Sequence, residues 1–195
     1  MRHNQGMTTL PITYRASDET PVEMSEAQAI WAVEARAVLE QVAGSYHALI
    51  TTRELADRVQ EQSGIKTRKP MHRWIGGVLD PVGRECHAKD EPLLSALCVL
   101  ADGTIGAGYP LAVAEIYGGD VPADPDMHAA EERLKCYRHF GATMPADGGR
   151  PALTRQVAAR RSTIARRARD DIQRAVCPTC HLALPATGQC DNCTL

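Results

Sequence analysis

The chain is poor in aromatic residues, since only one Phe, two Trp and five Tyr occur among its 195 residues. Its hydrophobic fraction of 44% must therefore come mainly from Ala, Val, Leu and Ile, a composition that favours packed helices over a β-sandwich. A chain of this length suits one moderate core with appended elements rather than two large domains. We expect a mainly α fold.

Long apolar runs are also missing. No stretch approaches the roughly 20 consecutive apolar residues of a membrane span, and the first 20 residues contain no apolar segment of the secretory kind. These absences predict a cytoplasmic protein without membrane segments. Seven cysteines could form disulfides in a secreted protein, but four of them lie in two CxxC pairs, while Cys86, Cys98 and Cys136 are isolated. Reduced thiols and a metal ion are the simpler interpretation.

The two CxxC pairs are Cys177-Pro-Thr-Cys180 and Cys190-Asp-Asn-Cys193, with nine residues between them. Each CxxC turn brings two thiolates to one ion, and four thiolates complete a tetrahedron with no position left for water. The spacing therefore predicts a structural Zn²⁺ within residues 177–195, a segment that resembles a minimal zinc ribbon of the kind common in nucleic-acid-associated proteins. The alternatives are two disulfides, four unrelated cysteines, or His181 in place of one cysteine ligand.

Hydrophobic periodicity predicts helices over residues 25–44, 52–62 and 70–80. A short apolar run, an Asp-Gly turn and a glycine-rich return then predict a β-hairpin over residues 93–113. Three helices followed by a hairpin is the element order of a winged helix-turn-helix, in which the third helix enters the major groove of DNA. We assign this fold to residues 25–120.

The flanking segments have weaker patterns. Residues 1–24 contain two prolines and no helical period, which indicates a mobile arm. Pro81 and Gly83 predict a kink or break after the third helix. Residues 121–149 comprise a further amphipathic helix, over residues 129–140, and a linker.

Residues 150–176 predict a long helix with eight arginines against two aspartates, a local charge of +6 in a chain whose net charge is −2. Such a charge run can be a solvated face, a coiled-coil partner or a track for phosphates. Its position directly before the cysteine-rich segment favours contact with nucleic acid. The candidate contacts are the basic residues on or beside the predicted third helix and four arginines of this long helix: Lys66, Arg68, Lys69, His72, Arg73, Arg160, Arg161, Arg166 and Arg167.

Four segments match a known pattern: Thr52, Glu54-Leu55-Ala56, Gly76-Gly77-Val78-Leu79 and the turn from Asp102 to Tyr109. Over about 60 residues this region resembles the DNA-binding half of alkylguanine alkyltransferases and alkyltransferase-like proteins. Those alkyltransferases have Pro-Cys-His-Arg at the strand, where this chain has Ala96-Leu97-Cys98-Val99. Because the histidine and arginine that activate the thiol are missing, Cys98 is more simply a buried apolar residue than a nucleophile.

Catalytic motifs are otherwise absent. His72, His87, His128 and His139 have neither HExxH nor HNH spacing, and no phosphate-binding glycine loop follows a predicted strand. The leading hypothesis is a non-enzymatic protein that binds double-stranded DNA, and the Ala, Arg and Gly content suggests a GC-rich bacterium or its phage.

Two alternatives remain. Because 22 basic residues against 24 acidic ones give no overall attraction to DNA, the protein could instead be a protein–protein adaptor in a DNA-processing or defence complex. A DNA repair enzyme or nuclease that uses Cys98 or the histidines is the third hypothesis.

Overall fold

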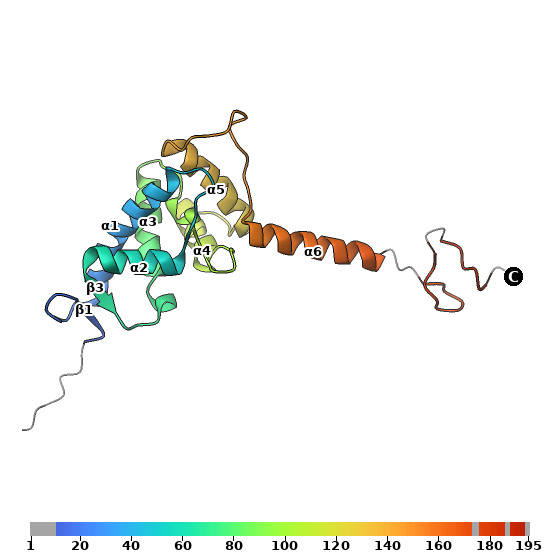
Figure 1. The fold of residues 1–195 in the computed structure, drawn as a ribbon, viewed down its shortest axis with the longest axis horizontal. Helices are drawn as coiled ribbons and strands as arrows, with labels where there is room; N and C mark the ends of the chain where they lie inside the picture. Colours follow the sequence, from blue (N-terminus) through green and yellow to red (C-terminus); the bar gives the residue numbers. More distant parts are fainter. Residues whose placement is uncertain (1–10, 173–175, 186–187, 194–195) are drawn as a thin grey trace, which may run out of the picture. The chain divides into compact units, whose positions relative to one another are not determined.

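The computed structural model describes residues 11–172, 176–185 and 188–193 (Figure 1). The chain divides into two compact units, Met1–Leu153 and Thr154–Leu195, which we call the first and second unit. As expected, the described part is mainly helical, with two small two-stranded sheets. None of its helices is both long enough and apolar enough to cross a bilayer.

Helices α1 (Met24–Ala43) and α2 (Thr52–Ser63) form as the sequence predicted. α2 begins with a capping box, in which the Glu54 N–H donates to Thr51 Oγ1 at 3.2 Å and the Thr51 N–H donates to Glu54 Oε2 at 2.8 Å. It ends at Gly64, whose φ of 67° is left-handed and favours glycine. These two local signals explain why the bounds of α2 could be predicted closely.

The segment after residue 10 is not a mobile arm. Strand β1 (Thr13–Arg15) pairs antiparallel with β3 (Ile65–Thr67), and the Arg68 N–H extends the pairing by donating to the Ile12 carbonyl at 2.8 Å. The expectation for residues 1–24 is therefore wrong from residue 11 onward, while residues 1–10 lie outside the described part. A three-residue strand has too little periodicity to be seen in sequence, and its partner lies more than 50 residues away.

Helix α3 (Gly76–Ala88) begins later than predicted, after a 3₁₀ turn, η1 (Met71–Arg73). The break expected at Pro81 does not occur, because α3 continues through this residue to Ala88. Proline removes one helical N–H donor, but Val82 and Cys86 beyond it are almost fully buried in the core. The part of α3 after Pro81 packs against the core, which offsets the loss of the one hydrogen bond that the proline nitrogen cannot donate.

The β-hairpin predicted over residues 93–113 is replaced by other elements. A 3₁₀ turn, η2 (Leu94–Leu97), leads into strand β4 (Cys98–Val99), which pairs in parallel with β2 (Ile50–Thr51). The pairing after β4 is limited to an antiparallel bridge between Val99 and Ile105 and a hydrogen bond from the Leu100 N–H to the Thr104 carbonyl at 2.8 Å, and helix α4 (Gly108–Tyr117) follows. Within the described residues the wing is thus missing, so the winged helix-turn-helix is not confirmed.

Two further helices complete the described part. α5 (Pro125–His139) starts four residues before the predicted helix, because Asp124 Oδ1 accepts the Met127 N–H at 3.0 Å and Pro125 occupies the first turn. α6 (Arg155–Ile172) belongs to the second unit. Its first turn is capped by Thr154, whose hydroxyl accepts the Val157 N–H at 3.3 Å.

Candidate metal centre, basic surfaces and cavity

The four cysteines of the second unit come together as predicted. The sulfur atoms of Cys177, Cys180, Cys190 and Cys193 all lie within 4.8 Å of one another. The Cys177–Cys193 separation is 3.7 Å and the Cys180–Cys190 separation is 3.3 Å. A tetrahedron with metal–sulfur bonds of about 2.3 Å has edges of about 3.8 Å, so these sulfurs are spaced to hold one metal ion.

Tight backbone turns position these thiols. The His181 N–H donates to the Cys177 carbonyl at 2.9 Å, and the Cys193 N–H donates to the Cys190 carbonyl at 3.2 Å. His181 has a φ of 56°, a left-handed conformation that a residue with a side chain adopts at some cost. Its imidazole is not part of the cluster, so the geometry favours four sulfur ligands over a set that includes this histidine.

The four thiols of the cluster differ in their electrostatic surroundings. Backbone N–H groups of Cys180 and Thr179 lower the pKa of the Cys177 thiol, because they donate to its thiolate form. Hydrogen bonds to Cys180 and Cys177 raise the pKa of the Cys193 thiol. Some thiols are thus favoured in the charged form and others in the neutral form, and a bound divalent cation would favour the thiolate at all four.

The first group of predicted nucleic-acid contacts lies before α3 rather than on it. Lys66 belongs to β3, Arg68 and Lys69 follow it, and His72 and Arg73 belong to η1. Except for half-buried Lys66, these side chains are exposed. The Arg68 guanidinium donates to the Pro11 carbonyl at 3.1 Å, so this arginine also holds the N-terminal segment in place.

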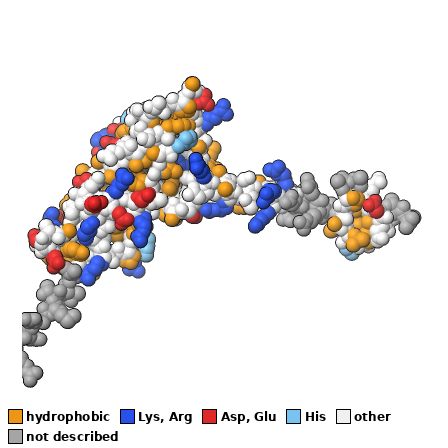
Figure 2. Space-filling view, viewed as in Figure 1, with side chains coloured by type: hydrophobic (Ala, Val, Ile, Leu, Met, Phe, Trp, Pro, Cys, Tyr) orange, Lys and Arg blue, Asp and Glu red, His pale blue; other side chains and the backbone are white. Residues whose placement is uncertain are grey.

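The second group lies on α6. Between Arg155 and Arg169 the helix has no acidic residue, and Val157 is the one buried side chain of this stretch. The basic side chains along α6, which are all arginines, are blue in Figure 2. Six arginines of the stretch are exposed: Arg155, Arg160, Arg161, Arg166, Arg167 and Arg169.

Charge is distributed unevenly between the two units. The first unit has 15 Lys and Arg against 21 Asp and Glu, a net −6, whereas the second has 7 against 3, a net +4. The overall value of −2 therefore hides an acidic unit and a basic one. Attraction to a polyanion belongs mainly to the second unit.

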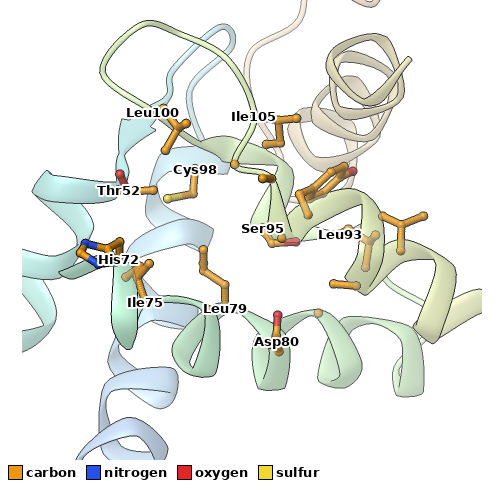
Figure 3. Close-up of a pocket in the computed structure, with 18 of the residues that line it drawn as sticks. Thr52, His72, Ile75, Leu79, Asp80, Leu93, Ser95, Cys98, Leu100 and Ile105 are labelled. Carbon is orange, nitrogen blue, oxygen red and sulfur yellow. The ribbon is translucent and has the colours of Figure 1, made fainter. Parts of the chain in front are cut away.

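The first unit also contains a cavity of about 340 Å³ that sequence reasoning did not predict (Figure 3). Ile75, Leu79 and Leu93 contribute apolar walls, and Asp80 and Ser95 contribute polar groups. Burial raises the pKa of the Asp80 carboxyl. The exposed residues His72 and Leu100 also line the cavity, which therefore opens to solvent on their side.

Cys98 lines the same cavity but lacks the surroundings of a nucleophile. Burial raises the pKa of its thiol to about 12, and Glu54 acts in the same direction. The thiol is therefore protonated at neutral pH, which agrees with the expected role of a buried apolar residue.

Several glycines line this cavity. Gly76, Gly106 and Gly108 line it, and an added Cβ at each would meet no atom within 4 Å. Gly83 also lines it, at 3.0 Å between its would-be Cβ and Ile116 Cδ1. These glycines come from separate segments, so their convergence could not be seen from the sequence.

Comparison of the chain with models of protein families, with curated proteins and with solved structures finds no match.

Proposed function

We propose that this protein binds double-stranded DNA without catalysing a reaction, and that a structural Zn²⁺ holds its C-terminal segment. The observation that supports DNA binding most strongly is α6, which exposes six arginines and no acidic residue between Arg155 and Arg169. Each arginine that reaches a phosphate releases condensed counterions, which gives affinity that depends on salt.

The first unit has a secondary part in this proposal. Lys69, His72 and Arg73 are exposed within one short stretch and can contact phosphates. Because the unit as a whole is acidic, these residues orient the protein on the duplex more than they attract it.

The proposed metal role is structural. Thiolates are soft ligands that suit Zn²⁺, and four of them would close its coordination shell. Cys177, Cys180, Cys190 and Cys193 would hold the ion, which would stabilise a segment too small to have a core of its own.

The test is fluorescence anisotropy of labelled duplex DNA across a salt series with the full chain prepared in Zn²⁺. Replacing Arg160, Arg161, Arg166 and Arg167 with Ala should lower the slope of log affinity against log salt by roughly 0.9 for each phosphate contact that is lost. The matched control has the same charge change in the first unit, at four exposed positions: Arg53, Arg58, Arg84 and Lys89. Its slope should remain close to that of the unchanged protein.

Two other outcomes would contradict the proposal. An unchanged slope in the α6 variant would remove these arginines from the interface. If the unchanged protein fails to bind duplex even at low salt, the adaptor hypothesis takes precedence, and isolation of protein partners becomes the next experiment.

The cavity favours a second candidate, recognition of a base extruded from the duplex. It is mainly apolar, contains a few polar groups and opens beside His72, as expected of a pocket that receives a base next to a phosphate-binding surface. The resemblance to alkyltransferase-like proteins supports the same proposal. In the same titration, a duplex with 2-aminopurine should gain fluorescence on binding. Ala112→Phe, which fills the cavity, should abolish the gain, whereas exposed Leu111→Phe on the same helix should not.

A further inference from the structure

The arginines of α6 point in three directions around the helix. At about 100° per residue, Val157, Ile164 and Ala168 fall within about 40° of one another and form an apolar stripe. Ile164 is 60% exposed and Ala168 is also exposed, whereas Val157, near the start of the helix, is buried. The angular positions of the arginines around the helix are expressed relative to this stripe.

The stripe has arginines on both sides. Arg160 and Arg167 lie about 60–80° to one side of it, while Arg161 and Arg169 lie about 40–120° to the other. A third pair, Arg155 and Arg166, lies on the opposite face of the helix, about 160–180° from the stripe. The exposed part of this face is therefore an apolar line between two rows of cations. Such a face is complementary to a partner whose surface has an apolar floor and an anionic wall on each side.

The major groove of B-form DNA has this chemistry. Its floor presents thymine methyl groups among the base edges, phosphates line both sides, and its width of about 12 Å admits an α-helix of about 10–12 Å diameter. The 18 residues of α6 extend about 27 Å, enough to cross such a groove. The major groove of A-form RNA is too narrow for a helix, and a single strand has only one phosphate row.

We infer that α6 lies in the major groove of B-form DNA. Ile164 and Ala168 face the base edges, Arg160 and Arg167 contact the phosphates of one strand, and Arg161 and Arg169 contact those of the other. Arg155 and Arg166 point away from the duplex. This inference rests on the proposed DNA binding and adds the groove, the face of the helix and the form of the duplex.

The experiment compares three double variants of the full chain that change the net charge equally: R160A/R167A, R161A/R169A and R155A/R166A. Each of the first two should lower the salt slope on a mixed-sequence duplex DNA by about 1.8 and weaken binding roughly 10- to 100-fold at moderate salt. The third should leave both quantities within about twofold. Alanine is a strong helix former, so circular dichroism should show unchanged helix content in all three.

Other patterns would overturn the inference. Equal losses of affinity in all three variants would indicate that the helix is attracted to DNA by its charge without a fixed orientation. A loss of affinity confined to one of the first two variants would place the helix along a single strand. Failure of the unchanged protein to bind any duplex would instead refute the proposed function itself.

A second readout is dimethyl sulfate, which methylates guanine N7 in the major groove. The unchanged protein should protect N7 in bound duplex DNA, and R160A/R167A should reduce that protection. Tighter binding to an RNA duplex of the same sequence, or bound DNA without protection, would contradict placement in the major groove.

Discussion

Cys98 is buried in strand β4, and its thiol has a pKa near 12 against an ordinary value of 9.0. Between these values the unfolded chain loses a proton that the folded chain keeps, so stability falls as pH rises from about 9 towards 12. At pH 10 the loss from this thiol is on the order of 1 kcal/mol. Valine does not titrate, so replacing Cys98 with valine removes this loss. The effect of the replacement on the free energy of unfolding should therefore be about 1 kcal/mol more favourable at pH 10 than at pH 7.

Urea unfolding followed by tryptophan fluorescence at the two pH values measures this difference. Other buried titrating groups, such as Tyr109, are present in both proteins and cancel in the comparison. An identical effect of Cys98→Val at both pH values would mean that the pKa of the thiol is the same in the folded and unfolded chains. A less favourable effect at pH 10 than at pH 7 would mean that folding lowers this pKa, and would reopen the nucleophile hypothesis.

Single residues differ in how far the sequence predicts their surroundings. The four metal-site cysteines lie within 17 consecutive residues, so two short turns bring them together and their spacing is sufficient evidence. The lining of the cavity comes from segments between Thr52 and Ile116 that meet only after the core has packed. No local sequence pattern predicts contacts between segments so far apart in the chain.

At the scale of elements, α1 is joined to α3 and the loop after it by Arg36. This side chain is 12% exposed, and its guanidinium pairs with Glu40 at 2.9 Å, Glu85 at 3.4 Å and Glu91 at 2.6 Å. Arg36→Ala would leave the largely buried Glu91 carboxylate without its partner. We expect a loss of about 1–3 kcal/mol in the free energy of unfolding, measured by urea titration.

Arg84→Ala is the matched control, because Arg84 and Glu115 form a 3.6 Å pair whose side chains are 56% and 73% exposed. Solvent screens such a pair, and its loss should cost less than about 0.5 kcal/mol. Similar costs for the two variants would show that Arg36 is not a link between elements.

Elements with local signals were predicted, and elements defined by distant partners were not. α2 has its capping box and Gly64, and both of its ends were found. The apolar run Leu93–Val99 suits a strand as well as a buried turn, since both bury successive residues. Burial in the core favours the turn. Leu93, Leu94 and Leu97 are fully buried there, whereas an exposed hairpin would place alternate residues in water.

At the scale of the whole molecule, the division into two units predicts independent responses to metal removal. Trp31 and Trp74 both lie in the first unit, with ring centroids 4.6 Å apart, so tryptophan fluorescence reports on that unit. A strong chelator should abolish the thiolate absorption bands of the Co²⁺-substituted protein. It should change the tryptophan-monitored free energy of unfolding by less than about 0.5 kcal/mol.

Cys190→Ser in the presence of metal should behave like the chelated protein. A fall of more than about 1 kcal/mol in the tryptophan-monitored stability, in either case, would show that the units are energetically coupled.

The pairing of β1 with β3 has a consequence for synthesis. Thr13 contacts Thr67, 54 residues later, through hydroxyls 3.0 Å apart. On the ribosome β1 emerges about 50 residues before its partner, so its edge stays unpaired until β3 has been synthesised. A nascent chain arrested before residue 65 would present that unpaired edge to other chains, which favours misassembly until β3 emerges.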